Sequence, residues 1–391
     1  MRPGNQPLGN NVDRNMKKIA VVFGTRPEAI KLAPVILALR KSRRFSCNVC
    51  VTGQHREMLQ QVLGVFKIEP DVDLALMKRD QTLAELTSRS VSALDRYFAE
   101  TRPDAVVVQG DTTTVLCASL AAFYHHVPIA HVEAGLRTRD LESPWPEEGN
   151  RQMVSRLAKW HFAPTESNRR NLLDEGIPDS SIFVTGNTVI DALLLAKSFP
   201  ETTGRTIRGL PGDSLTFLES ERMVLVTGHR RENFGNGFEN ICHAIGRLAA
   251  DFPNVHFIYP VHLNPNVRAP VNRILGGTAP SNVHLIEPQD YLSFVALMNR
   301  SAVILTDSGG VQEEGPSLGK PVLVMRDTTE RPEAVEAGTA KLVGASADTI
   351  VAETSVLLRD STAYAKMANA VNPYGDGKAS QRILEVLSNN T

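Results

Sequence analysis

The feature that most constrains the fold is a short apolar run, rich in β-branched residues, that recurs along the chain. Each run is followed by a polar turn and, in most cases, by a helical stretch. Such runs are typical of parallel strands buried on both faces, and their alternation with helices is typical of βα units. The sequence therefore predicts an α/β protein. The expected strands are residues 18–23, 46–52, 105–109, 128–133, 161–163, 182–184, 223–227, 255–260, 283–286, 302–306 and 322–325.

The βα pattern occurs in two halves, which predicts two Rossmann-like, doubly wound domains with a ligand crevice between them. A length of 391 residues suits two domains. We expect a disordered leader, an amino-terminal domain, a carboxyl-terminal domain that opens with a Pro-, Gly- and Ser-rich connection, and a last helix. Their predicted bounds are 1–16, 17–197, 198–375 and 376–391. The first βα turn lacks G-x-G-x-x-G, so a dinucleotide site is not indicated.

Charge and cysteine content exclude several classes of function. The formal net charge is −1, so no overall field attracts nucleic acid or an anionic membrane. The four cysteines are too few and too scattered for a secreted disulfide framework. No apolar run reaches the length of a membrane span, and the amino terminus has no signal-peptide core. These features predict a cytoplasmic protein without nucleic-acid or membrane partners.

Metal-binding patterns are weak. Cys47 and Cys50 form a lone C-x-x-C inside an expected strand, which favours buried thiols over a zinc site. His229 and Glu232 do not form H-E-x-x-H, so His229 is interpreted as a hydrogen-bonding or titrating group near phosphate. No metal is predicted.

The octapeptide at residues 307–314 (DSGGVQEE) predicts a strand-turn-helix junction. Gly309 and Gly310 allow close approach of a ligand to the backbone, Ser308 offers a hydroxyl, and free N–H groups at the start of a helix favour phosphate. Glu314, one turn further, could accept hydrogen bonds from sugar hydroxyls. An ordinary capped helix would account for this octapeptide equally well on its own.

Two successive strands in the first half end on acids. Asp111 follows the strand at 105–109, and Glu133 ends the strand at 128–133. Because successive parallel strands end at the same edge of a sheet, both acids are expected in one crevice. Glu147 follows a loop stiffened by two prolines and could be presented there, although Glu147 and Glu148 could equally be first-turn acids of the next helix.

Basic and aromatic residues also follow expected strand ends. Arg26 follows the first strand, where open α/β sheets bind ligands, and Lys31 lies on the helix after it. Arg331 lies in the turn at 326–333. Phe294, on a helix just past a strand end, is interpreted as a core residue or as a surface for a nucleotide base.

Eight motifs occur in order along the chain: residues 24–31 (GTRPEAIK), 53–56 (GQHR), 110–114 (GDTTT), 131–137 (HVEAGLR), 144–148 (PWPEE), 228–233 (GHRREN), 307–314 and 326–333 (RDTTERPE). Together they resemble the bacterial non-hydrolysing UDP-N-acetylglucosamine 2-epimerases, and the resemblance extends from about residue 17 to the end of the chain. It implies the GT-B architecture with an interdomain cleft, a last helix that crosses back to the first domain, no cofactor and a homodimer.

The resemblance also implies a reaction and residue roles. UDP-N-acetylglucosamine and UDP-N-acetylmannosamine would interconvert by anti elimination of UDP to 2-acetamidoglucal and re-addition. The implied catalytic residues are Asp111, Glu133, Glu147 and His229. The implied substrate-binding residues are Arg26, Lys31, Gln289, Phe294, Ser308, Gly309, Gly310, Glu314 and Arg331. A second UDP-N-acetylglucosamine would activate the enzyme near Gln54, Glu57, Arg230 and His262, although Glu57 stands where some members have Gln.

Three other functions share part of this pattern. A GT-B glycosyltransferase would use the diphosphate site without three clustered acids. A hydrolysing epimerase would release free N-acetylmannosamine. A nucleotide-sugar sensor would not need the acids at all. The sequence does not distinguish which face of C2 each carboxylate would serve, nor which polysaccharide pathway the product would supply.

Overall fold

The computed structural model describes residues 16–53, 56–78, 81–202, 204–218, 220–277 and 280–391, without the side chains of 56–58. The chain divides into two compact units. The first comprises the described residues up to Thr188 together with Lys378–Thr391, and the second comprises Val189–Gly377. The corresponding boundaries predicted from the sequence fall after residues 197 and 375. All but the last residue of the predicted leader, 1–15, lie outside the described residues.

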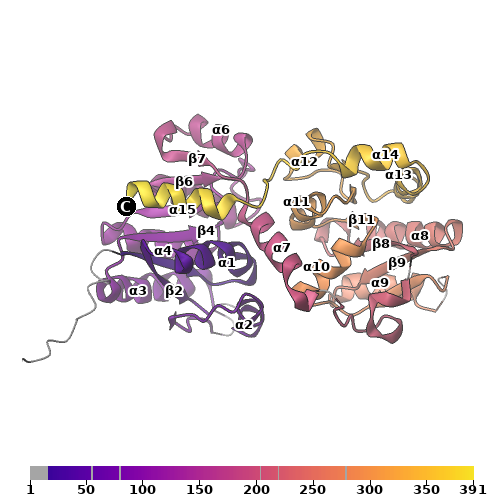
Figure 1. Cartoon of the computed structure of the whole chain (residues 1–391), viewed down its shortest axis with the longest axis horizontal. Helices are drawn as coiled ribbons and strands as arrows, with labels where there is room; N and C mark the ends of the chain where they lie inside the picture. Colours follow the sequence, from indigo (N-terminus) through magenta and orange to yellow (C-terminus); the bar gives the residue numbers. More distant parts are fainter. Residues whose placement is uncertain (1–15, 54–55, 79–80, 203, 219, 278–279) are drawn as a thin grey trace, which may run out of the picture. The chain divides into compact units, whose positions relative to one another are not determined.

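The first unit is built on a seven-stranded sheet in which every strand pair is parallel (Figure 1). The strand order is β3-β2-β1-β4-β5-β6-β7. This is a doubly wound order: the chain adds strands from β1 toward one edge of the sheet, then returns to the centre and adds strands from β4 toward the other edge. The strands are β1 (Lys17–Phe23), β2 (Phe45–Val51), β3 (Val72–Asp73), β4 (Ala105–Gln109), β5 (Ile129–Val132), β6 (Trp160–Ala163) and β7 (Ile182–Val184).

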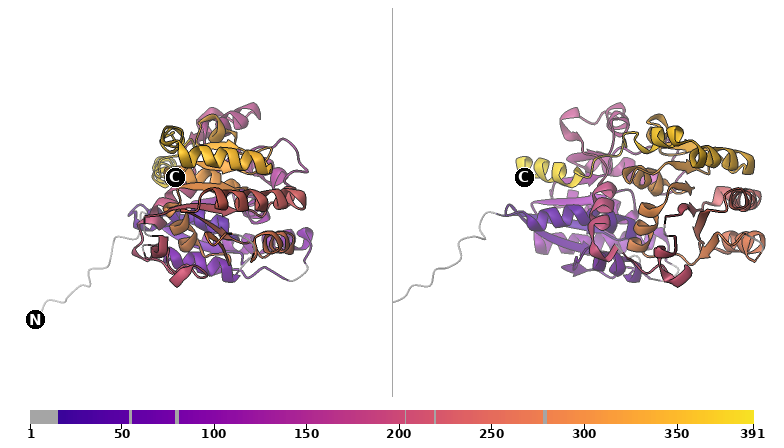
Figure 2. Two further views of the ribbon diagram at one scale, coloured as in Figure 1. Left: turned by 90° about the vertical axis from the view of Figure 1, so that its right-hand side faces the viewer. Right: turned by 45° about the vertical axis from the view of Figure 1, so that its right-hand side comes forward.

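Helices flank this sheet, and they form two packed groups (Figures 1 and 2). In one group α4 packs against α3 and α5, and in the other α1 packs against α2 and α15. The carboxyl-terminal helix therefore belongs to the first unit, where Ile383 and Leu387 are fully buried. The helices are α1 (Arg26–Lys41), α2 (Arg56–Val65), α3 (Leu83–Thr101), α4 (Thr113–Tyr124), α5 (Glu147–Leu157), α6 (Glu166–Asp174) and α15 (Ala379–Asn390).

The second unit has a six-stranded parallel sheet of the same winding, in the order β10-β9-β8-β11-β12-β13. The order in which strands are added reverses between β8 and β11. Its strands are β8 (Arg222–Thr227), β9 (Val255–Pro260), β10 (Val283–Ile286), β11 (Val303–Thr306), β12 (Val322–Val324) and β13 (Ala340–Leu342). Its helices are α7 (Thr188–Ser198), α8 (Asn236–Asp251), α9 (Pro265–Leu275), α10 (Tyr291–Arg300), α11 (Gly309–Ser317), α12 (Pro332–Glu336), α13 (Ala347–Arg359) and α14 (Ser361–Ala368).

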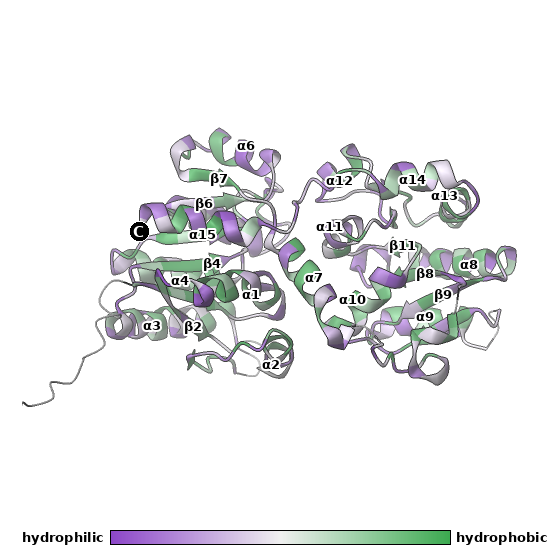
Figure 3. Ribbon diagram, viewed as in Figure 1, coloured by the Kyte–Doolittle hydropathy of each residue, from purple (hydrophilic) through white to green (hydrophobic). Residues whose placement is uncertain are grey.

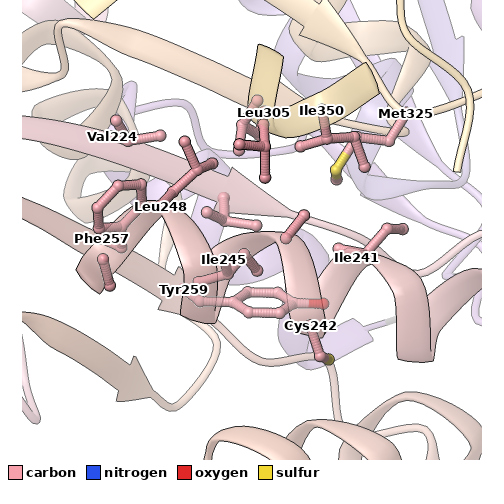
Figure 4. Packing of buried hydrophobic residues seen from close by; sticks show 14 of the residues in the cluster. Val224, Ile241, Cys242, Ile245, Leu248, Phe257, Tyr259, Leu305, Met325 and Ile350 are labelled. Carbon is pink, nitrogen blue, oxygen red and sulfur yellow. The ribbon is translucent and has the colours of Figure 1, made fainter. Parts of the chain in front are cut away.

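Apolar side chains at helical spacing join the helices to the sheets. In the second unit Ile241, Ile245 and Leu248 form one face of α8 and pack, within one buried cluster, with Phe257 and Tyr259 of β9 (Figure 4). Central strands such as β4 are hydrophobic along their length, whereas most helices carry polar residues as well (Figure 3). This distribution is the one expected for sheets that are covered on both faces.

The predicted fold class is confirmed: the protein is α/β with two Rossmann-like units. The expected strands and helices are present, with ends that differ by a few residues. Two strands were missed, β3 and β13. Cys47 and Cys50 both lie in β2 as free thiols, and burial raises the pKa of each to about 12. Among the residues described, no helix is long and apolar enough to span a membrane.

Candidate functional site

Glu133 directly follows β5 and is surrounded by donors from three other parts of the first unit. Both carboxylate oxygens lie 2.7 Å from Nζ of Lys31 on α1. Gln109, the last residue of β4, donates to one oxygen, and Nδ2 of Asn187 lies 3.2 Å from the other. The side chain of Glu133 is only 8% exposed. Because an isolated buried carboxylate would be costly, the lysine and the two amides stabilise its charged form.

Asp111 lies beyond the end of β4, where the preceding Gly110 has φ +81°. Its Oδ2 lies 2.5 Å from Nη2 of Arg151, and its backbone carbonyl accepts a hydrogen bond from Nδ2 of Asn150 at 2.9 Å. Burial raises the pKa of Asp111; Arg151 opposes this rise and nearby Glu133 adds to it. A carboxyl group whose pKa lies above its usual value is suited to exchanging a proton near neutral pH.

Glu147 and Glu148 are both in the first turn of α5, as one of the two interpretations of the sequence expected. Glu148 is fully buried and accepts hydrogen bonds from the backbone N–H groups of Thr138 and Arg139. Burial alone would raise the pKa of Glu148, but these bonds together with donors on the side chains of α5 lower it. Glu148 therefore holds the preceding loop, whereas Glu147 is half-buried.

A further carboxylate, Glu28, joins the loops that follow β1 and β4. It accepts hydrogen bonds from the backbone N–H groups of Gly24 and Thr25 at 2.9 and 2.6 Å and from Oγ1 of Thr112 at 2.6 Å. Part of this set is a capping box at the start of α1. The loop that carries Arg26 and the loop that carries Asp111 are therefore tied together where the strand order reverses. Arg26 has no ion-pair or hydrogen-bond partner within the described ranges.

In the second unit, the octapeptide 307–314 forms the predicted junction between β11 and α11. Ser308 is the N-cap residue, and its side chain makes no capping hydrogen bond. A Cβ atom added to Gly309 would lie 3.7 Å from Nη2 of Arg230 and 4.0 Å from Nη2 of Arg331. Two guanidinium groups thus border the start of α11, where N–H groups already favour an anion.

Glu314 and Arg331 lie beside this helix start, whereas Gln289 and Phe294 follow β10, which β9 and β8 separate from β11. A Cβ atom on Gly310 would lie 3.8 Å from Oε2 of Glu314. Arg331 forms an ion pair with buried Glu313, which fixes its guanidinium beside α11. Gln289 and Phe294 lie at the β10–α10 junction; Nε2 of Gln289 donates to the carbonyl of Glu287 at 2.6 Å, and Phe294 is half-buried.

Asp307 connects the turns that follow β8 and β11. Its Oδ2 accepts hydrogen bonds from the backbone N–H groups of His229 and Arg230, both at 2.8 Å. The ring of His229 has Nδ1 3.4 Å from Oδ1 of Asp307 and stacks on His262, with centroids 5.5 Å apart and an interplanar angle of 22°. Burial, Arg230 and His262 lower the pKa of His229, and Asp307 opposes them. The lowered pKa favours the neutral form of the imidazole.

In each unit the structure brings part of the predicted residues together. In the first unit the structure brings together Lys31 and Glu133, and Asp111 lies close enough to respond to the charge of Glu133. Of the proposed regulatory residues, Arg230 and His262 both lie beside His229. Gln54 lies outside the described residues, and Glu57 is in α2 with a side chain that is not described.

Several residues of the first group were not predicted. They are Gln109, Asn150, Arg151 and Asn187. Gln109 could have been found, because a polar residue that ends a buried strand points to the same edge as the acids. The others contact the acids only through the tertiary fold, and no local pattern marks them.

Comparisons with known proteins identify the family of this chain. A family model described as UDP-N-acetylglucosamine 2-epimerase matches residues 37–388. The chain is 58% identical over 374 residues to the UDP-N-acetylglucosamine 2-epimerase of Escherichia coli O157:H7, covering 95% of this chain and 99% of that one.

Solved structures give the same result. The chain is similar to the Neisseria meningitidis UDP-GlcNAc 2-epimerase bound to UDP-GlcNAc, with a TM-score of 0.85, 52% identity, and coverage of 95% of this chain and 100% of that chain. It is also similar to the Methanocaldococcus jannaschii UDP-GlcNAc 2-epimerase in complex with UDP-GlcNAc and UDP, with a TM-score of 0.74, 33% identity and the same coverage. The resemblance inferred from the motifs is confirmed, and the protein is an isomerase with the GT-B type of fold that belongs to the UDP-N-acetylglucosamine 2-epimerase family.

Proposed function

We propose that this protein catalyses the reversible C2 epimerisation of UDP-N-acetylglucosamine to UDP-N-acetylmannosamine. The observation that carries the proposal is the pair of acids at the ends of β4 and β5, each held by its own cationic side chain. Glu133 is paired with Lys31, and Asp111 is paired with Arg151. Two separately supported carboxylates in one place suit a reaction that moves protons on both faces of one carbon.

The proposed route is anti elimination followed by re-addition. A base removes the proton from C2, the electron pair forms the C1=C2 bond of 2-acetamidoglucal, and the C1–O bond breaks to release UDP. In the return step a proton is delivered to the opposite face of C2 and a diphosphate oxygen re-forms the bond to C1. We assign proton handling to Asp111, Glu133 and Glu147, without assigning faces, and assistance near the leaving group to His229.

Stabilisation of the departing diphosphate is assigned to the second unit, with Arg26 contributing from the first. The N–H groups that begin α11, at Ser308, Gly309 and Gly310, are bordered by the guanidinium of Arg331. Such preorganised donors stabilise developing negative charge. Glu314 would bind the ribose, and Gln289 and Phe294 would bind the uracil. Lys31 would act on the substrate indirectly, by holding the carboxylate of Glu133 in position.

We further propose a homodimer in the cytoplasm that supplies a surface polysaccharide precursor, with a second UDP-N-acetylglucosamine as activator. The positions of Arg230 and His262 around His229 support the regulatory part, because a ligand that binds them would touch the environment of a catalytic side chain. Gln54 and Glu57 complete the proposed regulatory set.

The decisive experiment incubates the protein with UDP-N-acetylglucosamine in deuterated water. Deuterium at C2 of intact UDP-N-acetylglucosamine and UDP-N-acetylmannosamine supports the proposal. Free N-acetylmannosamine would instead indicate hydrolysis, and absence of exchange would indicate a glycosyltransferase or a sensor.

Variants assign the chemistry to the site. Asp111→Asn should slow exchange by about 10²-fold or more, because removing a general acid or base costs that much. The matched control is Asp95→Asn on α3, which removes an exposed carboxylate paired with His125 and should leave exchange unchanged. Full exchange by Asp111→Asn would remove that residue from the mechanism.

A further inference from the structure

Arg151 is a buried cation that connects two carboxylates of different kinds. Its side chain is 7% exposed. Nη2 lies 2.5 Å from Oδ2 of Asp111, and Nη1 lies 3.1 Å from Oε2 of Glu148. Glu148 is itself held by two backbone N–H groups of the loop before α5. The guanidinium therefore has one fixed partner and one partner at the site of the proposed chemistry.

The same helix holds Asp111 in a second way. Asn150, the residue before Arg151, donates from Nδ2 to the backbone carbonyl of Asp111 at 2.9 Å. The first turn of this helix also carries Glu147, the third proposed acid. One rigid element thus determines the position of Asp111 through both its backbone and its side chain, and it presents Glu147 as well.

We propose that Arg151 is a positioning residue of the epimerase reaction. Buried Glu148 orients its guanidinium, and the guanidinium sets the direction and the charge state of the Asp111 carboxylate. This inference rests on the proposed function, and it assigns Arg151 a role in the reaction rather than in folding alone. A guanidinium suits the role because its N–H donors lie in one plane, so it can bind two carboxylates in a fixed relative orientation.

The charges around Asp111 give the test a sign. Burial raises the pKa of Asp111, and Arg151 opposes the rise. The negative charge of Glu133 raises this pKa as well, and the positive charge of Lys31 lowers it. Removing the positive charge of Arg151 raises the pKa of Asp111 further. Removing the negative charge of Glu148 leaves the positive charge of the guanidinium less neutralised, which lowers the pKa of Asp111. The expected direction of the shift is the same whether Asp111 acts as an acid or as a base. Each limb of a pH–rate profile moves in the same direction as the pKa that controls it.

The experiment measures kcat and KM for C2 epimerisation from pH 5.5 to about pH 9. In Arg151→Gln we expect kcat to fall about 10²-fold with a change in KM of less than about threefold, and one limb to move to higher pH by about half a unit or more. Arg151→Lys, which keeps the charge, should restore that limb toward the wild-type position. In Glu148→Gln the same limb should move to lower pH.

Arg137→Lys is the matched control. Arg137 has a buried side chain in the same unit and is paired with Glu175, but it does not touch Asp111. It should lower thermal stability without moving either limb. Folding of each variant is checked by circular dichroism. If Arg151→Gln does not fold, Glu148→Gln still tests the proposal through its expected shift to lower pH. A limb at its wild-type position in Arg151→Gln or in Glu148→Gln would overturn the proposal, whereas an inactive wild-type protein would overturn the proposed function instead.

Discussion

Buried carboxylates in this protein differ in the donors that surround them. Glu28, Glu148 and Asp307 accept backbone N–H groups from neighbouring turns, so they hold loops in place. Asp111 and Glu133 are held by charged side chains from elsewhere in the fold. A side-chain donor can move when a carboxylate gains or loses a proton, whereas a backbone donor is held in place by the chain on both sides. The second group is therefore better suited to proton transfer.

Replacing Glu133 by glutamine tests this distinction. The amide keeps the size of the side chain but cannot take up a proton, so we expect kcat to fall about 10²- to 10⁴-fold. The measurement is deuterium incorporation at C2. Glu166→Gln is the control, because it removes an exposed carboxylate paired with Arg169 on α6. Exchange at the wild-type rate in Glu133→Gln would contradict a role for Glu133 in proton transfer.

His131 predicts a pH dependence of stability. Burial lowers its pKa to about 3, although its Nε2 hydrogen-bonds the carbonyl of Gly110 at 2.7 Å. The unfolded value is about 6.5. Because the folded pKa is the lower of the two, this histidine stabilises the fold fully above about pH 6.5, and the contribution is lost as the pH falls toward the folded value. The expected slope is about 1.4 kcal/mol per pH unit.

The check is denaturant unfolding at pH 7.5 and about pH 5. The loss of unfolding free energy between these two pH values should be about 2 kcal/mol smaller in His131→Gln than in the wild type. His243→Gln, which changes an exposed histidine on α8, should behave as the wild type does. An identical loss in wild type and His131→Gln would show that His131 is protonated in the folded state at pH 5.

At the scale of elements, the predictable strands were those with a continuous buried run. β4 and β11 are such runs, and the parallel direction of the strands follows from the βα alternation. β3 has only two residues, one of them Asp73, and the three residues of β13 include Lys341, so neither strand is a continuous apolar run. The acids were predictable because they end strands, but Arg151 lies 40 residues from Asp111, and only the fold brings them together.

Gly135 shows how one element depends on another. It has φ +88°, and a Cβ atom at this position would lie 2.2 Å from the backbone oxygen of Asn168 at the start of α6. Gly135→Ala should therefore cost about 3 kcal/mol or more in unfolding free energy, since neither backbone can yield easily. Gly176→Ala, at φ +77° with nothing within 4 Å, should cost only about 1 kcal/mol. Equal losses in the two variants, measured by denaturant unfolding, would contradict a steric cause.

At the scale of the whole molecule, the two units repeat one design. Each has a parallel sheet whose order reverses between two adjacent strands, and a buried carboxylate joins the two loops at that reversal. Glu28 does so in the first unit and Asp307 in the second. Ligands of open α/β sheets bind at such reversals. The shared design explains why polar residues at strand ends were informative in both halves of the sequence.

The chain does not complete its units in order, because α15 returns to the first unit after the second is finished. Ile383 is fully buried there, and α15 packs on α1. Ile383→Ala should therefore destabilise the first unit by about 2–5 kcal/mol, the usual cost of such a truncation. Hydrogen exchange should become faster in β1 and β4 while the slowest amides of β8 and β11 stay protected, since each unit has its own core. Glu385→Ala, on the exposed side of the same helix, should change neither sheet. Equal acceleration in both sheets would mean that the two units unfold as one cooperative body.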